Sequence, residues 1–152
     1  MAEAEWQHPG LVFKFKVEIT KKGGKVEAGF TECSGLNIDR EAIEYREGGL
    51  NDYIHVLPGR IKYQHIVLKR GMTKSKELWD WFKGSLQAGK VEYRNMTIKL
   101  YSWDSADENA PIRTWNITDA DPVKWTGATF NADQNAVAIE TLELAHHGIT
   151  ET

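Results

Sequence analysis

FTECSGLNIDREAIEYREGGLNDYIHVLPGR, residues 30–60, joins short strand-like runs through glycine-bearing corners and contains no reactive-site pattern. Within it, Leu36 and Ile38 are apolar at even positions, whereas Ile43 and Tyr45 are apolar at odd positions. Side chains along a strand point alternately to two faces, so this change of parity predicts a bend or bulge that switches the apolar face. The stretch is therefore expected to serve contact and not chemistry.

Two pairs of turn residues in this stretch enclose an excursion of the chain. Gly48-Gly49 precede the run from Leu50 to Leu57, and Pro58-Gly59 follow it. Glycine and proline in such pairs are typical of tight turns. We therefore predict an extended arm over residues 47–60, which leaves the body of the protein, returns to it and needs a surface to lie on.

Length and composition predict one globular domain over residues 1–152. A chain of 152 residues can bury roughly two-thirds of its unfolded surface in a single core. Hydrophobic residues make up 41% and charged residues 27%, which is ordinary for a globular protein. The formal net charge of −3 argues against a protein that coats nucleic acid, because such proteins carry a basic excess.

The cysteine content and the N-terminal residues bear on the compartment in which the protein is expected to be synthesised. Cys33 alone cannot form an intramolecular disulfide or a thiolate metal site. Residues 1–10, expected to form an N-terminal arm, lack the apolar core of a signal peptide, and no run approaches the ~18 apolar residues of a membrane span. We expect synthesis in the cytoplasm, so the glycosylation sequons at Asn95 and Asn116 are expected to be chance matches.

Strands are predicted where apolar and polar residues alternate with a period of two. The clearest run covers residues 11–19. After a turn at Gly23-Gly24 the alternation resumes at Val26, which indicates an antiparallel hairpin. Further strands are predicted at residues 61–69, 95–103, around 115–117 and at 137–147.

One helix is predicted over residues 73–88, because apolar residues recur there at every fourth position. The members of this apolar stripe are Leu78, Phe82 and Leu86. Trp79 and Phe82 are expected to pack the helix onto a sheet, with Trp81 at the edge of that contact or at a subunit boundary. The expected caps are Thr73 or Ser75 at the start of the helix and Gly89 at its end.

No catalytic or metal-binding constellation is predicted. His65 has no carboxylate or second histidine at a useful local spacing, so a histidine packed within a strand is expected. The candidate ligands of a hard cation are Asp104, Asp107, Glu108, Asp119 and Asp121. They lack the spacing and the glycine of a calcium loop. The sequence also has no phosphate-binding loop, nucleophile elbow or Cys/His cluster, so we predict no enzyme activity, no metal and no cofactor.

Glu140 and Glu143 are embedded in the last predicted strand, and a pair of carboxylates can serve a hydrolase. Three residues apart in a strand, however, they point to opposite faces. Salt bridges at an interface are therefore the preferred interpretation. The order of strands, one helix and further strands predicts a mainly β fold, an antiparallel β-sandwich or barrel with one packed α-helix.

Several short motifs become specific through their order and spacing. They are Ser34-Gly35-Leu36, Glu44-Tyr45-Arg46-Glu47-Gly48-Gly49, Leu57-Pro58-Gly59-Arg60, Lys69-Arg70-Gly71, Leu78 with Trp79 and Trp81, and the run from Val137 to His146. From about Leu11 to Ile149 the chain resembles the tail tube protein family of contractile phage tails and phage-tail-like contractile injection systems. The resemblance implies a fold like that of the type VI secretion tube protein. It also implies hexameric rings whose sheets join into an inner barrel, stacked into a tube inside a contractile sheath.

The resemblance further implies partners and a location. The expected partners are further copies of the chain, a contractile sheath protein, baseplate and spike proteins, and a cargo or tape-measure protein in the lumen, with no membrane insertion. The protein would be part of a virion tail or an injection particle, and extracellular once that particle is released. The alternative is a type VI-like secreted ring protein that carries effectors in its pore, and an enzyme on a sandwich fold is a third class.

Two sets of residues are assigned to this assembly. Contact with a neighbouring subunit is predicted for Asp39, Arg40, Glu41, Glu44, Tyr45, Arg46, Glu47, Gly48, Gly49, Leu57, Pro58, Gly59, Arg60, Glu140 and Glu143. The polar faces of the two cleanest strands are predicted to line the channel, because pore-lining strands show one face to water and the other to the core. These residues are Lys14, Lys16, Glu18, Asn95, Thr97 and Lys99. Their alternative position, facing the sheath, stays open.

Overall fold

The computed structural model describes residues 14–46, 48–49, 53–87, 89–102, 110–133 and 137–152. Their elements are β1 (Lys14–Lys21), β2 (Gly24–Ala28), β3 (Glu32–Ser34), β4 (Ile38–Tyr45), β5 (His55–Tyr63), β6 (Ile66–Gly71), α1 (Glu77–Ser85), β7 (Arg94–Tyr101), β8 (Arg113–Thr126), β9 (Ile139–Ala145) and β10 (Gly148–Glu151). The expected mainly β class with one helix is confirmed. The predicted N-terminal arm over residues 1–10 lies outside the described residues.

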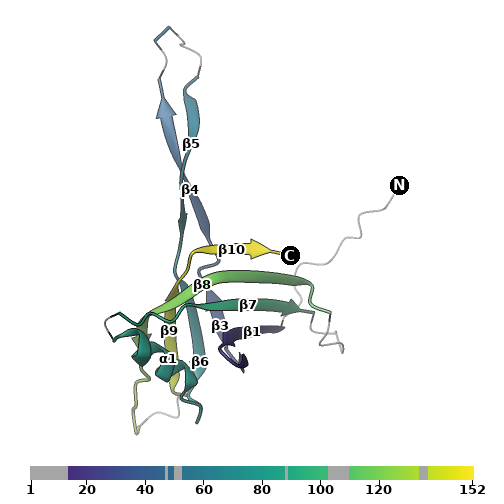
Figure 1. Ribbon diagram of the computed structural model, residues 1–152, viewed down its shortest axis with the longest axis vertical. Coiled ribbons are helices and arrows are strands. Elements are labelled where there is room, and N and C mark those ends of the chain that lie inside the picture. The colour runs from purple at the N-terminus through teal and green to yellow at the C-terminus, as the bar shows by residue number, and fades with distance from the viewer. Residues whose placement is uncertain (1–13, 47, 50–52, 88, 103–109, 134–136) are drawn as a thin grey trace.

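One antiparallel sheet forms the body, in the order β2-β1-β7-β8-β9-β6-β3, and β10 pairs with β8. The first half of β8 pairs with β7 and β10, and its second half pairs with β9. Between the halves, Asp119 has a φ of 51°, which is uncommon for a residue other than glycine. Strands β1 and β7 cross the direction of β6 and β9 (Figure 1). The long strand β8 therefore connects two crossed layers, which is the arrangement of an orthogonal sandwich.

The core lies between these two layers. Val17, Met96 and Ile117 come from the β1-β7-β8 layer, whereas Leu68 and Leu144 come from the β6-β9 layer, and none is more than 1% exposed. On β1 the buried apolar residues lie at odd positions, as the alternation of residues 11–19 predicted. A sheet strand with one buried face fixes its register strongly, because a shift by one residue would expose the whole apolar set.

Helix α1 buries a residue that the sequence pattern placed at the edge of its contact. Leu78 and Trp81 are its buried residues, each 2% exposed, whereas Trp79 is 42% exposed. Trp81 is buried because its Nε1 finds an acceptor, the carbonyl oxygen of Glu92, at 2.9 Å. The prediction that Trp81 stays at the edge of this contact was therefore wrong. The predicted packing of Trp79 and Phe82 on a sheet is confirmed, because their ring centroids lie 5.4 and 6.2 Å from that of Trp125 on β8.

The helix is also shorter than predicted. It spans nine residues, from Glu77 to Ser85, in place of residues 73–88. Lys76 occupies the N-cap position and makes no side-chain capping hydrogen bond, so the expected caps Thr73 and Ser75 are not used. Leu86, the last member of the predicted stripe, lies beyond the helix and is 66% exposed. The helix is therefore too short to include all three residues of the predicted apolar stripe.

Among the described strands, β4 and β5 pair only with each other, and they project from the body as a hairpin (Figure 1). The predicted bulge is confirmed, because the register of the pair shifts between Arg40 and Ala42. The predicted turn at Pro58-Gly59 was wrong, since both residues lie inside β5. A Cβ at Gly59 would lie 2.6 Å from the carbonyl oxygen of Glu41, so the glycine permits close approach of the two strands and not a change of direction.

Candidate functional site: the hairpin and a polar sheet face

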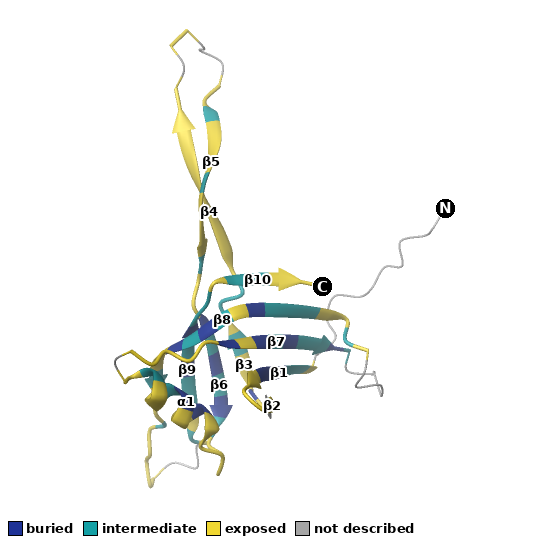
Figure 2. Ribbon diagram, in the orientation of Figure 1, coloured by how far each residue is buried: buried dark blue, intermediate teal, exposed yellow. Residues whose placement is uncertain are grey.

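The β4–β5 hairpin carries apolar side chains that the rest of the chain leaves exposed. Ile43 and Leu57 face each other in register and are 51% and 49% exposed. Tyr45 on β4 and Val56 on β5 are 55% and 62% exposed, and Figure 2 shows the hairpin exposed over most of its length. A two-stranded hairpin is at best marginally stable alone in water, and exposed apolar surface of this kind marks interaction sites. The hairpin is therefore the candidate contact element.

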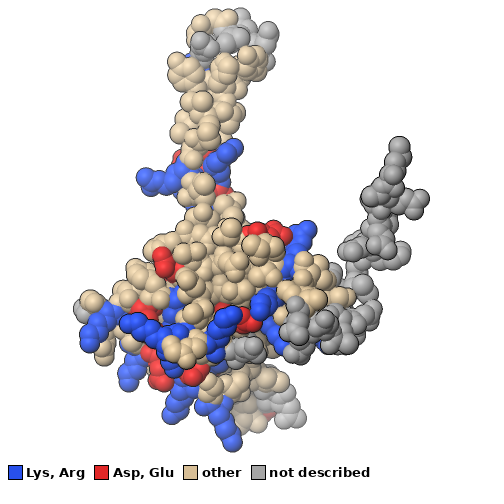
Figure 3. All heavy atoms as spheres, turned by 45° about the vertical axis from the view of Figure 1, so that its right-hand side comes forward, with Lys and Arg blue, Asp and Glu red and all other residues tan. Residues whose placement is uncertain are grey.

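Charged groups occupy a band of the hairpin nearer to the body. On the face drawn in Figure 3, Lys, Arg, Asp and Glu atoms gather across its middle, and its outer part is mostly neutral. The pairs in that part of the register include Asp39 with Lys62 and Arg40 with Ile61. Alternating charges of this kind set register and specificity more than affinity.

The structure divides the predicted contact residues between two places. Asp39, Arg40, Glu41, Glu44 and Tyr45 lie on β4, Arg46 follows it, Gly48 and Gly49 lie in a turn, and Leu57, Pro58, Gly59 and Arg60 lie on β5. Glu47 lies outside the described residues. Glu140 and Glu143 lie on β9, in the body. The hairpin thus collects most of the set, and the described residues of the predicted arm over residues 47–60 lie on β5 or in the turn at Gly48 and Gly49.

The two glutamates of β9 have partners within the chain. Glu140 Oε2 accepts a hydrogen bond from Arg70 Nε at 3.2 Å, and Glu143 Oε1 lies 2.7 Å from His65 Nδ1. Glu140 shares its face with the buried Leu142, whereas Glu143 does not, so the expectation of opposite faces is confirmed. The prediction that His65 packs within a strand was wrong. This residue lies in the link between β5 and β6, and its side chain is 51% exposed.

The root of the hairpin is held to the body by Gln64. Asn37 Nδ2 donates to Gln64 Oε1 at 2.9 Å, and Gln64 Nε2 donates to Asp39 Oδ2 at 3.1 Å. His146 Nε2 lies 3.0 Å from the carbonyl oxygen of Gln64. Burial lowers the pKa of His146 below its usual 6.5, so the neutral ring donates this hydrogen bond at pH 7. These bonds fix the direction in which the hairpin leaves the body.

Gly35 lies beside this root, and we expect Gly35→Ala to lower the free energy of unfolding by about 2–4 kcal/mol. Its φ of +89° disfavours any side chain, and a Cβ there would overlap the carbonyl oxygen of His65. Gly89→Ala is the matched control, because Gly89 has a φ of +86° and a Cβ added there would meet nothing within 4 Å. Urea unfolding followed by circular dichroism measures both variants. Equal losses would show that the contact with His65 does not matter.

A second candidate surface is the polar face of strands β1 and β7, which carries the residues predicted to line a channel. Lys16 stands opposite Lys99 in register, and Glu18 stands opposite Thr97. Glu18 Oε1 accepts a hydrogen bond from Lys99 Nζ at 2.7 Å, and Thr97 Oγ1 donates to Asn116 Oδ1 at 3.2 Å. The structure thus brings the two predicted sets together on one face of adjacent strands, opposite the core.

Glu18 makes this face sensitive to acid. Its hydrogen bond from Lys99 is the main cause that lowers the pKa of Glu18 below 4.5, and the residue is only 8% exposed. A lowered folded pKa stabilises the fold fully above the unfolded pKa, and this stabilisation is lost as the pH falls through the folded value. At pH 7 we expect the free energy of unfolding of wild type to exceed that of Glu18→Gln by about 1–2 kcal/mol. Thermal unfolding should show this difference shrinking below about pH 4.5, and a constant difference would contradict the assignment.

The structure also places two of the candidate metal ligands and the cysteine. They contain no group of three or more His, Cys, Asp or Glu that can hold a metal ion. Asp119 and Asp121 lie on β8, and Asp104, Asp107 and Glu108 lie outside the described residues. Burial raises the pKa of Cys33 to about 11, so the thiol stays protonated at neutral pH and is a poor nucleophile. Among the described helices, none is long and apolar enough to cross a membrane.

Comparisons with known proteins agree with this geometry. A protein-family model described as T4-like virus tail tube protein gp19 matches residues 11–150. A chain in the cryo-EM structure of the anti-feeding prophage baseplate is 27% identical with a TM-score of 0.84, over 96% of this chain and 97% of that one. A chain in the PVC sheath/tube terminator of an extracellular contractile injection system is 30% identical with a TM-score of 0.83, over 97% and 99%.

More distant likeness concerns the fold alone. A structure described as a type six secretion system protein is 10% identical with a TM-score of 0.54, over 91% of this chain and 83% of that one. The expected type VI-like fold is thereby confirmed. No curated protein matches the chain significantly.

Proposed function

The chain belongs to the T4-like virus tail tube protein family, and from that premise we propose that its copies form hexameric rings that stack into a hollow tube. The tube would lie inside a contractile sheath and conduct cargo or DNA. The observation that carries the proposal is the β4–β5 hairpin, whose apolar residues are about half exposed in one chain. Strands β2 and β3 also end the sheet without a further described neighbour, and unpaired edges of this kind are satisfied when subunits close into a ring.

Electron microscopy of the purified protein tests the proposal, because tubes, isolated rings and monomers differ visibly. We expect long hollow tubes with sixfold end views. Isolated rings that never stack would favour the alternative, a secreted ring protein that carries effectors in its pore. Monomers at all concentrations would overturn both.

The partners follow from the same premise. The related chains come from structures described as a baseplate, a sheath-tube complex and a tube-terminating cap. We propose that this chain likewise contacts a contractile sheath, a baseplate with its spike, and a cargo or tape-measure protein, and acts within a tail or injection particle without catalysing a reaction.

We propose that the polar face of β1 and β7 lines the lumen of this tube. Glu18 and Thr97 hydrogen-bond to Lys99 and Asn116 on that face, so part of its hydrogen-bonding capacity is used within the wall. Mixed polar groups of this kind hold a passing chain weakly. A channel that must release its cargo needs such a wall.

Cysteine labelling of assembled tubes tests the lumen assignment. We expect Lys16→Cys to react slowly with a maleimide reagent too large to enter the pore, and Lys83→Cys on the exposed side of α1 to react rapidly. The native Cys33 should react little with the maleimide, because burial raises the pKa of its thiol to about 11. Both positions should react equally in dissociated subunits. Equal rapid labelling along intact tubes would place the β1–β7 face outside.

A further inference from the structure

Three histidines meet at the root of the hairpin, and two of them have a carboxylate partner. His65 Nδ1 lies 2.7 Å from Glu143 Oε1, and His147 Nδ1 lies 3.2 Å from Asp119 Oδ2. A protonated imidazole forms a charge-assisted hydrogen bond with a carboxylate, so both of these sites accept a charged ring. The third histidine, His146, has no such partner among the described residues.

The site of His146 suits a neutral ring. Its Nε2 lies 3.0 Å from the carbonyl oxygen of Gln64, whereas its Nδ1 is buried and bonds to nothing in the described part of the chain. The ring of Tyr63 lies beside it, with the two centroids 5.4 Å apart. A neutral imidazole donates from one nitrogen and carries no proton on the other, but a charged ring has a second N–H that must also be satisfied. Protonation of His146 therefore leaves a buried donor unpaired, which costs free energy.

The groups around His146 act on its charge in opposite directions. Burial lowers the pKa of His146, and His65 and His147 lower it further when they are charged. The backbone of Gln64 and of Gly148 raises this pKa without compensating for burial. The other titratable groups that adjoining elements bring to the root are Asp39 of β4, Tyr63 of β5, Asp119 and Asp121 of β8, and Glu143 of β9. The ring of His146 is consequently neutral at pH 7 and gains its proton only in acid.

The bond from His146 is one of the few that join the hairpin root to the body. The side-chain amide of Gln64, in the link between β5 and β6, bonds to Asn37 and Asp39 at the start of β4, so these bonds close the base of the hairpin on itself. Among the described side chains, those of His146 and Glu143 bond to this link from β9 and the residue after it. Loss of the His146 bond therefore removes a large part of the hold on the hairpin.

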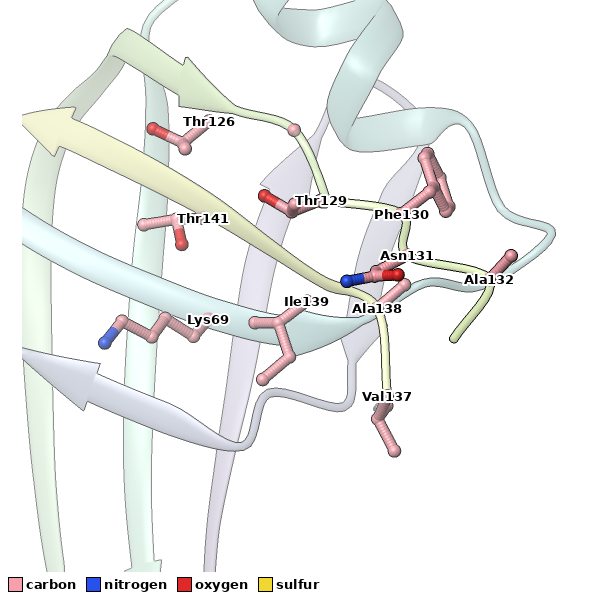
Figure 4. A pocket seen from close by; sticks show the side chains of 11 residues that line it. Lys69, Thr126, Thr129, Phe130, Asn131, Ala132, Val137, Ala138, Ile139 and Thr141 are labelled. Carbon is pink, nitrogen blue, oxygen red and sulfur yellow. The ribbon is translucent and has the colours of Figure 1, made fainter. Parts of the chain in front are cut away.

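The other end of β9 lacks groups that respond to mild acid. A hollow of about 760 Å³ lies there (Figure 4). Its described lining includes Thr141 of β9 and Lys69 of β6, and it contains no histidine or carboxylate. Imidazoles and carboxylates are the side chains that change charge between about pH 4 and pH 7. Mild acid therefore acts on the end of β9 at the root, and Thr141 is a fixed reference.

We propose that His146 is a pH switch for the direction of the hairpin. With a neutral ring, the bond to Gln64 holds the hairpin in the direction that Figure 1 shows. With a protonated ring, the unpaired second N–H favours movement of the imidazole out to water, and the hairpin swings on its remaining contacts. The pKa of His146 in the held form is below 6.5, so the released form binds the proton more strongly. The hold is intact above about pH 6.5 and weakens as the pH falls below that value.

The switch acts within one subunit. An element that is held in one direction beforehand loses less freedom when it binds. Neutral pH should therefore favour, and acid should oppose, whatever contact the hairpin makes. The inference goes beyond the proposed tube, because the swing is present whether or not subunits assemble.

Spin-label distances in dispersed subunits test the switch. Labels at Leu57→Cys on the hairpin and Thr141→Cys on β9 report the direction of the hairpin by pulsed electron paramagnetic resonance. We expect one narrow distance at pH 7.5 and, at about pH 5, a broad component at least about fivefold more populated. The control pair Lys83→Cys with Thr141→Cys lies within the body and should stay narrow at both values. Glu18 keeps its charge at pH 5, because its pKa is below 4.5.

Two histidine variants identify the group responsible. His146→Gln keeps an N–H donor near the position of Nε2 and cannot be protonated, so the Leu57–Thr141 distance should stay narrow in acid. His55→Gln changes a histidine at the end of β5 far from the root, and it should broaden as wild type does. Broadening of His146→Gln equal to that of wild type overturns the switch, because another group is then responsible.

Two results on the unsubstituted histidine also overturn the inference. One is a narrow Leu57–Thr141 distance at both pH values, which shows that the hairpin keeps its direction whatever the charge. The other is a pKa of His146 at or above 6.5 in a nuclear magnetic resonance titration, since a value below 6.5 is expected and supplies the driving force. All of these measurements use dispersed subunits, so they are distinct from the electron microscopy that tests the tube.

Discussion

Replacing Trp81 by alanine should lower the free energy of unfolding by about 3–5 kcal/mol, the usual cost of deleting a large buried aromatic ring. Trp81 is 2% exposed, and its Nε1 donates to the carbonyl oxygen of Glu92 at 2.9 Å. The guanidinium carbon of Arg94 lies 4.8 Å from the ring centroid, so the variant also removes a cation–π partner from a nearly buried charge. Since domains are stable by only about 5–15 kcal/mol, much of the protein should be unfolded before it can assemble.

Trp79→Ala on the same helix is the matched control. Trp79 is 42% exposed and meets Trp125 edge to face, with ring centroids 5.4 Å apart. Its loss should cost about 1 kcal/mol, as for partly exposed residues in general. Circular dichroism during urea unfolding measures both variants without relying on tryptophan fluorescence. If Trp79→Ala proves as costly as Trp81→Ala, burial of Trp81 is not the main contribution of the helix to stability.

The strands of the body were predictable because the alternation of apolar and polar residues within each strand indicates which of its faces is buried. On β1 and β7 every second residue is apolar, and Val17, Ile19, Met96 and Ile98 are buried as this alternation requires. The information is local, since one residue step changes the face. The continuation of β8 to Thr126 was missed, because the strand is interrupted at Asp119 by a positive φ that the alternation of residues does not indicate.

The buried face of the helix was mispredicted for a different reason. Leu78, Phe82 and Leu86 recur at every fourth position, but the helix ends at Ser85, and its contact uses Leu78 and Trp81. The acceptor that makes burial of Trp81 acceptable is eleven residues away at Glu92. A polar ring atom is buried only where it finds a partner, and such a partner cannot be located from the periodicity of the helix.

In the candidate site, too, features set by neighbouring residues were predictable, and features set by distant residues were not. The bulge near Arg40 was predictable from parity within β4, and it is present. His65 and Glu143 are 78 residues apart and meet at 2.7 Å, so no local spacing indicates their contact. Gly59 was taken for a turn residue because a glycine permits both turns and close backbone approach. Which of the two applies depends on the opposite strand, which the sequence does not identify.

Replacing Ile43 and Leu57 together by threonine should abolish tube formation at concentrations where wild type assembles, and leave the monomer folded. The two side chains face each other across the hairpin and are each about half exposed. Losing their burial against a partner removes about 2–4 kcal/mol from each contact. That loss raises the concentration needed for assembly at least about 30-fold. Sedimentation and electron microscopy over a concentration series measure this threshold.

The double threonine variant isolates contact from folding. Threonine is β-branched, as strands favour, and neither Ile43 nor Leu57 is buried in the monomer, so the melting temperature should stay within a few degrees of wild type. The control Val91→Thr with Ile112→Thr removes side chains that are 45% and 50% exposed on the body, and it should assemble normally. If both double variants lose tubes equally, apolar surface in general drives assembly and the hairpin has no special part. If neither loses them, the joint between subunits lies elsewhere, because a contact element cannot lose its central apolar pair without weakening the contact.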